Sequence, residues 1–228
     1  MPIRVDRTEE IRKALAAVYL KLFTEIKKDR NYPIDITFLK SKYNRKVYDA
    51  SRKAVSEVFA ESHKYVGRRL KVETFISDRD LGLIKEGTDK AVSLFWTRLD
   101  ADAGREQKIA QQQNRLIVQE VSNPFDTEFY LDNAAMITTT GALAIGTLSK
   151  TDQIASDPEL NATLDSRPVI RWVTKEDEKV CLQLPNGLPG CAFLDGQTWD
   201  YIDPDIPVPG RLGPNGTHPN CRCYLSLE

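Results

Sequence analysis

Proline is absent from the 90 residues between Pro33 and Pro124, whereas seven of the twelve prolines fall between Pro185 and Pro219. Because proline lacks a backbone N–H and clashes with the preceding helical turn, a long α-helix can pass through the first stretch but not through the second. Six of the twelve glycines lie in the proline-rich stretch and favour turns there. The 228-residue chain is therefore expected to change from long helices to short elements towards its C-terminus.

Apolar residues recur every three or four positions through the first part of the chain, as in Leu15, Val18 and Leu22, and this spacing predicts amphipathic helices. Ser77 is a favourable N-cap for the third of them. The fourth pattern is weaker and rich in small residues. The predicted helices cover residues 8–29, 36–71, 77–113 and 126–149.

Two segments near the C-terminus, residues 168–173 and 221–227, have the composition of β-strands, and turn-rich sequence separates them. The predicted fold class is α+β and mostly α: long N-terminal helices are followed by a small Cys-rich α+β module with short antiparallel strands. We expect two parts, a helical docking region at residues 1–150 and the C-terminal module at residues 151–228.

The near-neutral net charge of −1 conceals an uneven distribution. Residues 1–72 carry a net charge of +9 and residues 73–228 a net charge of −10. The basic residues of the second predicted helix form either a solvent-exposed face or a surface that binds an acidic protein or DNA phosphates. The candidate partner-binding residues are Arg45, Lys46, Arg52, Lys53, Arg68 and Arg69. His63, which lies in the same predicted helix, is expected to be exposed to solvent.

All four cysteines lie in the last quarter of the chain, so they serve one local structure. Residues i and i+2 of an extended strand face the same side, and Cys221 and Cys223 can therefore direct both sulfurs to one point. Thiolate and imidazole groups are the ligands of tetrahedral structural zinc sites. The candidate ligands, of which four would bind one structural zinc, are Cys181, Cys191, His218, Cys221 and Cys223.

The compartment decides between zinc and disulfide bonds. The N-terminal sequence MPIRVDRTEE lacks the apolar segment of a secretory signal peptide, and no apolar run is long enough to span a bilayer. We expect synthesis in the cytoplasm and no membrane insertion, which favours zinc. Unligated thiols, partial disulfide linkage and redox chemistry remain as alternatives.

The sequence contains no P-loop, nucleophile elbow, H-E-x-x-H or dinucleotide-binding glycine pattern. His218 lies among prolines and glycines, with no strand-to-helix turn that would orient it as a catalytic base. We therefore assign no catalytic residue. Trp172 and Trp199 are expected to be core aromatic residues of the small module.

The C-terminal part of the chain resembles the phage Mu F-like family of minor head proteins, which act in head morphogenesis of tailed phages. The resemblance covers about residues 130–228, and its most specific part is the H-P-N-C-R-C sequence at residues 218–223. The family usually has C-x-x-C where this chain has C-x9-C, with LQLPNGLPG between the two cysteines. The other matching residues are Trp172, Thr174, Asp177, Val180, Cys181, Cys191, Leu194 and Gly196.

The resemblance implies a non-enzymatic virion protein, made in the host cytoplasm and located in the head at the portal vertex. It implies a role in head assembly, DNA packaging or ejection, with the portal protein or the major capsid protein as partner and packaged DNA as a further partner. Two alternatives stay open. One is a nucleic-acid-binding protein with a structural zinc, and the other is a toxin-related Mu F-domain protein that lacks its catalytic domain.

Overall fold

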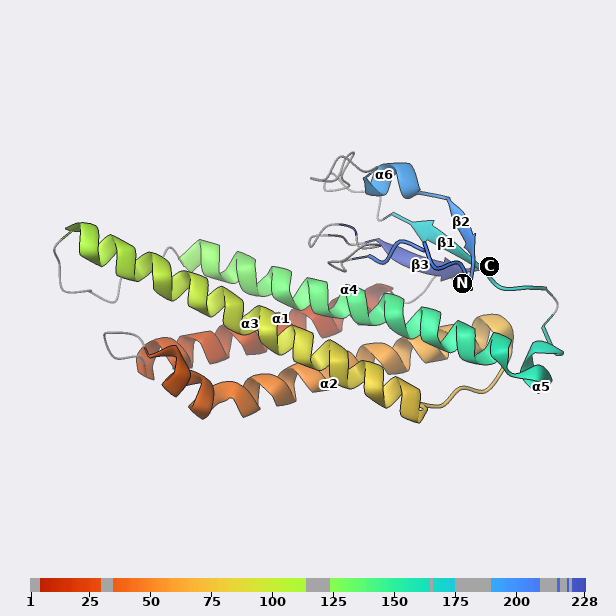
Figure 1. Ribbon diagram of the computed structural model, residues 1–228, viewed down its shortest axis with the longest axis horizontal. Coiled ribbons are helices and arrows are strands. Elements are labelled where there is room, and N and C mark those ends of the chain that lie inside the picture. The colour runs from red at the N-terminus through yellow and green to blue at the C-terminus, as the bar shows by residue number, and fades with distance from the viewer. Residues whose placement is uncertain are drawn as a thin grey trace.

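The computed structural model describes residues 5–29, 35–113, 124–164, 166–174, 190–209, 217, 221 and 223–228. Four long helices run alternately up and down and form an elongated bundle (Figure 1). They confirm the predicted helices, and the fourth extends beyond its predicted bounds at both ends. No described helix combines the length and the apolar character needed to cross a bilayer. The helices are α1 (Val5–Asp29), α2 (Ile36–Leu70), α3 (Asp78–Gln113) and α4 (Pro124–Ser156).

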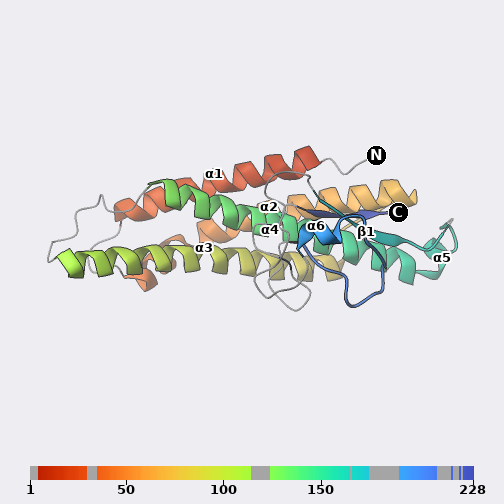
Figure 2. The same cartoon turned by 90° about the horizontal axis from the view of Figure 1, so that it is seen from above.

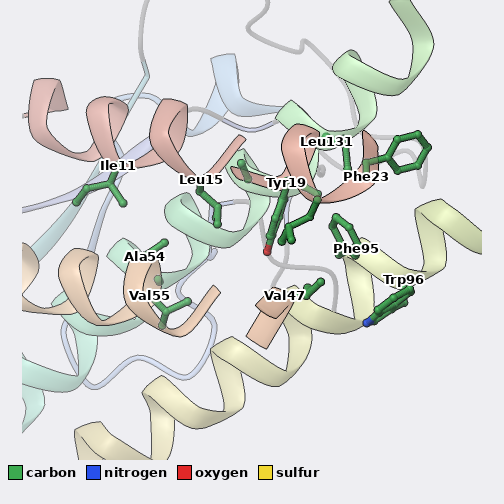
Figure 3. Packing of buried hydrophobic residues seen from close by; sticks show 14 of the residues in the cluster. Ile11, Leu15, Tyr19, Phe23, Val47, Ala54, Val55, Phe95, Trp96 and Leu131 are labelled. Atoms are coloured by element: carbon green, nitrogen blue, oxygen red, sulfur yellow. The ribbon is translucent and has the colours of Figure 1, made fainter. Parts of the chain in front are cut away.

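The apolar stripes of all four helices meet in one core (Figure 3). Tyr19 is fully buried on α1, and its ring packs at a centroid distance of 5.0 Å against Phe95 of α3. The Tyr19 hydroxyl lies 2.8 Å from Ser51 Oγ on α2, so the one polar atom of this ring has a partner inside the core. The amphipathic spacing read from the sequence therefore corresponds to real burial of one face of each helix.

Gly146 lies at a close approach of α4 to α2. A Cβ atom at this position would overlap the Ser62 hydroxyl and lie 3.2 Å from Ser62 Cβ. Ser62 is fully buried and donates a hydrogen bond to the Phe59 carbonyl at 2.8 Å. Gly141, one and a half turns earlier on α4, lies instead at a cavity of about 300 Å³ between α2, α3 and α4, where an added Cβ would touch nothing.

A buried polar cluster joins α2, α3 and α4 at the end of the bundle where α2 ends. Asp80 of α3 is fully buried and accepts hydrogen bonds from the backbone and hydroxyl of Ser77, which confirms Ser77 as the N-terminal cap. It also accepts from Ser149 at 3.1 Å and Gln153 at 2.9 Å on α4. These hydrogen bonds fix the carboxylate at the junction of the three helices.

The prediction that His63 is exposed to solvent is wrong, because the residue is only 2% exposed. Its Nε2 lies 3.5 Å from Asp80 Oδ1, and neither ring nitrogen has a well-formed hydrogen bond within the described part of the chain. Burial lowers the pKa of His63, and the attraction of Asp80 and the repulsion of Lys150 act in opposite directions on it. The helical stripe of apolar residues continues past this position, and His63 occupies a place on it that the sequence pattern did not reveal.

After α4 the chain forms a small module with a three-stranded antiparallel sheet in the order β2-β1-β3. This sheet confirms the predicted short antiparallel strands and the α+β, mostly α class. The short helix α6 and the strand β2 lie in the segment for which the sequence predicted turns, and α5 lies in a segment for which it predicted no element. The elements are α5 (Pro158–Asn161), β1 (Val169–Val173), α6 (Cys191–Leu194), β2 (Thr198–Asp200) and β3 (Tyr224–Leu227).

The module packs along the bundle beside α2 and α4 (Figures 1 and 2). Its core is shared, since Tyr65 and Val66 of α2 and Ala144 and Ile154 of α4 belong to the same buried cluster as the sheet. The division at residue 150 remains a prediction. The apolar contacts of the module continue into the bundle.

We expect protonation of His63 to destabilise the fold in weak acid. Because burial lowers the pKa of His63 below its ordinary value of 6.5, the unfolded chain binds this proton first as the pH falls. Above about pH 6.5, His63 is neutral in both states and does not reduce the free energy of unfolding. Below this pH, the free energy of unfolding should decrease by up to about 1.4 kcal/mol per pH unit. Urea unfolding from about pH 7.5 to 5.5 should show a shallower slope for His63→Gln than for the unchanged chain. Equal slopes would contradict the prediction.

Substitution of Gly146 by alanine should separate α2 from α4. The added methyl overlaps Ser62, and we expect a net loss of about 1–3 kcal/mol of unfolding free energy despite the better helix propensity of alanine. Gly141→Ala is the matched control on the same helix, and it should stabilise the chain by about 1 kcal/mol because its methyl meets open space. Chemical denaturation measures both, and Ser62→Ala should restore part of the loss in the Gly146→Ala chain.

Candidate metal centre

Three cysteines from two separate segments meet in the interior of the module. Cys191, Cys221 and Cys223 are all less than 5% exposed, and their sulfur atoms lie within 4.8 Å of one another. Cys191 Sγ is 3.5 Å from Cys221 Sγ, much farther than the about 2.05 Å of a disulfide bond. This cysteine triad is a cluster of thiols at the separation expected of ligands around one ion.

Hydrogen bonds between α6 and β1 place Cys191. The Thr174 backbone N–H at the end of β1 donates to the Asp195 carboxylate at 2.8 Å, and Gly196 N–H donates to the Trp172 carbonyl at 3.0 Å. Gly196 adopts a φ of +76°, a conformation that favours glycine over residues with a side chain. These contacts hold the end of α6 beside the sheet, and Cys191 lies one helical turn earlier, at the start of the same short helix.

Cys221 and Cys223 directly precede β3, whose residues pair with β1 in antiparallel register. Both sulfurs are directed to one point, as the sequence predicted, although the two residues lie before the strand and not within it. Both are buried with Cys191. The C-R-C sequence therefore supplies two sulfurs from one strand end, and α6 supplies the third.

The electrostatics of the triad favour one thiolate. Hydrogen bonds from the thiols of Cys191 and Cys223 lower the pKa of Cys221 to about 3, and the Thr217 hydroxyl and the Cys223 backbone N–H act in the same direction. Donation to Cys221 correspondingly raises the pKa of Cys191. A sulfur surrounded by donors is prepared to act as a metal ligand, because the ligand form of cysteine is the thiolate.

The geometry fits a tetrahedral ion with thiolate ligands. Zinc–sulfur bonds of about 2.3 Å in a tetrahedron place neighbouring sulfurs about 3.8 Å apart, which agrees with the separations in the triad. Cys181 and His218, the other two predicted ligands, lie outside the described residues. The triad thus contains three of the five predicted ligands and can hold a metal ion.

The predicted partner-binding residues of α2 have different surroundings. Arg45, Arg52 and Lys53 are exposed, and the Arg45 guanidinium lies 3.9 Å from the Asp49 carboxylate. Lys46 pairs with Glu25 of α1 at 3.1 Å. Some of the predicted basic residues of α2 are therefore free to meet a partner, whereas Lys46 already pairs with a carboxylate of α1.

The two remaining predicted residues lie at the end of α2. The exposed Arg68 donates from Nε to the Lys64 carbonyl at 3.1 Å. Arg69 donates from Nε and an Nη to the Leu227 carbonyl at 2.9 and 2.7 Å. Arg69 therefore joins the bundle to β3, a role that the sequence did not indicate.

Thr217 and Trp172 are further residues beside the triad. Each is placed near a sulfur by the tertiary structure, Thr217 near Cys221 and Trp172 near Cys223. The sequence predicted Trp172 only as a core aromatic residue, and no spacing rule connects it with Cys223 fifty-one positions later. No protein-family model, curated protein or solved structure matches the chain.

Proposed function

We propose that the cysteine triad binds one structural zinc ion, with Cys181 or His218 as the fourth ligand. The buried convergence of Cys191, Cys221 and Cys223 carries the proposal. Within the described residues, the sheet of the module has three short strands, and a structural zinc contributes folding free energy to small domains of this kind. Zinc binding would connect the start of α6 to the start of β3 and close the module around its core.

We further propose that the chain is a non-enzymatic minor head protein of a tailed phage, associated with the portal vertex. The H-P-N-C-R-C end supports this function through the resemblance to Mu F-like proteins, and its two cysteines belong to the triad. The elongated bundle offers a long lateral surface for docking in the head. Such a protein acts by contact with partners, in head assembly, DNA packaging or ejection.

The exposed basic residues of α2 are the proposed docking surface. Arg45, Arg52 and Lys53 point to solvent, and opposite charge on a partner would guide its approach. An acidic face of the portal or of the major capsid protein is the partner that we propose. Direct binding of packaged DNA by the same residues is the competing outcome, recognised by a steep decrease of affinity with salt.

Metal analysis of protein purified without chelator should find about one zinc per chain, as expected for a single site. Cys221→Ser combined with Cys223→Ser should reduce the zinc content to nearly zero and expose the module to protease after residue 168. We expect the far-UV signal of the long helices to persist. Comparison of Cys181→Ser with His218→Ala would identify the fourth ligand. Absence of zinc from the unchanged protein, with freely titrating thiols, would refute the zinc proposal.

The head-protein proposal predicts that the chain is present in purified phage particles. Mass spectrometry of gradient-purified heads from cells that encode it should detect the chain at a few copies per major-capsid complement. Arg52→Glu with Lys53→Glu should lower its incorporation. Lys13→Glu with Lys21→Glu, which makes the same charge change on exposed positions of α1, is the matched control and should not. Absence from both procapsids and mature heads would refute the assignment.

A further inference from the structure

Trp172 is a fully buried residue at the centre of the module, and its indole N–H has no well-formed hydrogen bond in the described part of the chain. A buried N–H group without an acceptor loses the hydrogen bond that it would make with water, and this loss destabilises the folded chain. Tryptophan is normally placed in a core where its N–H reaches a partner. The surroundings of this nitrogen therefore require an explanation.

The strand register identifies the group that faces the indole. Trp172 on β1 is paired with Leu225 on β3. In an antiparallel pair, the residues two positions before and after the partner lie diagonally on the same face, within reach of an aromatic side chain. For Trp172 these are Cys223 and Leu227, and of the two only the Cys223 side chain can accept a hydrogen bond. The Trp172 and Cys223 side chains belong to the same buried cluster.

The Trp172 side chain lies close enough to Cys223 to interact with it. A cysteine binds a metal ion as the thiolate. An indole N–H is a donor only, so it complements a thiolate and has nothing to accept from a thiol S–H.

The backbone of Trp172 also positions the other arm of the triad. Its N–H donates to the Gln197 carbonyl at 2.9 Å, and its carbonyl accepts from Gly196 N–H at 3.0 Å, which holds the turn that follows α6. The backbone of Trp172 therefore bonds to the turn that follows α6, the helix that begins with Cys191, while its side chain lies beside Cys223.

We propose that Trp172 is a positioning residue of the metal centre, whose indole N–H donates to Cys223 Sγ and orients this sulfur toward the ion. This inference rests on the proposed zinc site and assigns a donor to it. Groups that hydrogen-bond to metal ligands fix the direction of the ligand and its charge, and their loss typically weakens binding about 10–100-fold. No feature of the cysteine spacing indicates this role.

The experiment compares three full-length variants, in each of which one tryptophan side chain is replaced. Trp172→Phe removes the donor and part of the ring. Replacement of Trp172 alone by benzothienylalanine keeps the size of the ring but exchanges N–H for sulfur. Trp199→Phe is the control, because Trp199 is a half-buried residue on β2 of the same sheet, paired with Ile170.

Each protein is titrated with Co²⁺ and with Zn²⁺, and the sulfur-to-cobalt charge-transfer band is recorded. Both Trp172 replacements should bind the metals about 10–100-fold more weakly. Their band should shift to longer wavelength, since a thiolate without its donor releases charge to the metal more readily. Trp199→Phe should leave affinity and band unchanged.

Unchanged affinity and band in both Trp172 replacements would overturn the inference while leaving the zinc site intact. It would also be overturned if benzothienylalanine behaved as tryptophan and only Trp172→Phe weakened binding, because packing alone would then explain the effect. If the unchanged protein bound neither metal, the zinc proposal itself would fail, and this inference with it. The band position distinguishes a lost hydrogen bond from a loosened core, because loosening alone does not alter the charge on the sulfur.

Discussion

The contact between β3 and the C-terminal part of α2 connects the two parts of the molecule. β3 is an edge strand, and the N–H and carbonyl of Leu227 point away from its partner β1. The Leu227 N–H donates to the Tyr65 hydroxyl at 2.9 Å, and its carbonyl accepts two hydrogen bonds from Arg69. Side chains of α2 therefore satisfy the backbone groups that an edge strand would otherwise expose. Cys221 and Cys223 directly precede this strand, so the position of the triad depends on the same contact.

The long helices could be predicted from sequence because each depends on local properties: a stripe of apolar residues and the absence of proline over 90 residues. The elements of three or four residues, such as α6 and β2, could not, because too few positions exist to establish a period. His63 shows a further limit. Charged and polar residues surround it in sequence, and its burial results from the packing of α3 and α4 against α2, which places Asp80 beside the ring.

The candidate site likewise has features that local geometry predicts and features that only tertiary contacts determine. The spacing of Cys221 and Cys223 predicted that their sulfurs share one side of the chain, because this depends on strand geometry alone. That Cys191 joins them depends on the contacts of α6 with Thr174 and Trp172, which are tertiary. The indole donor depends on the register of β1 against β3, and one residue of slip would turn Trp172 to the other face of the sheet.

The charge asymmetry along the sequence also acquires a structural meaning. Part of it is neutralised by ion pairs between helices, in which Arg12 of α1 pairs with Asp132 of α4 and Lys40 of α2 lies 3.5 Å from Asp100 of α3. A basic first half and an acidic second half thus favour packing of the first two helices against the last two, a modest effect for each exposed pair. Groups that take part in such pairs are poor candidates for binding a partner, since a partner would have to displace an existing carboxylate. Exposed residues that lie outside them, Arg52 and Lys53, are therefore the part of α2 on which a docking surface would depend most.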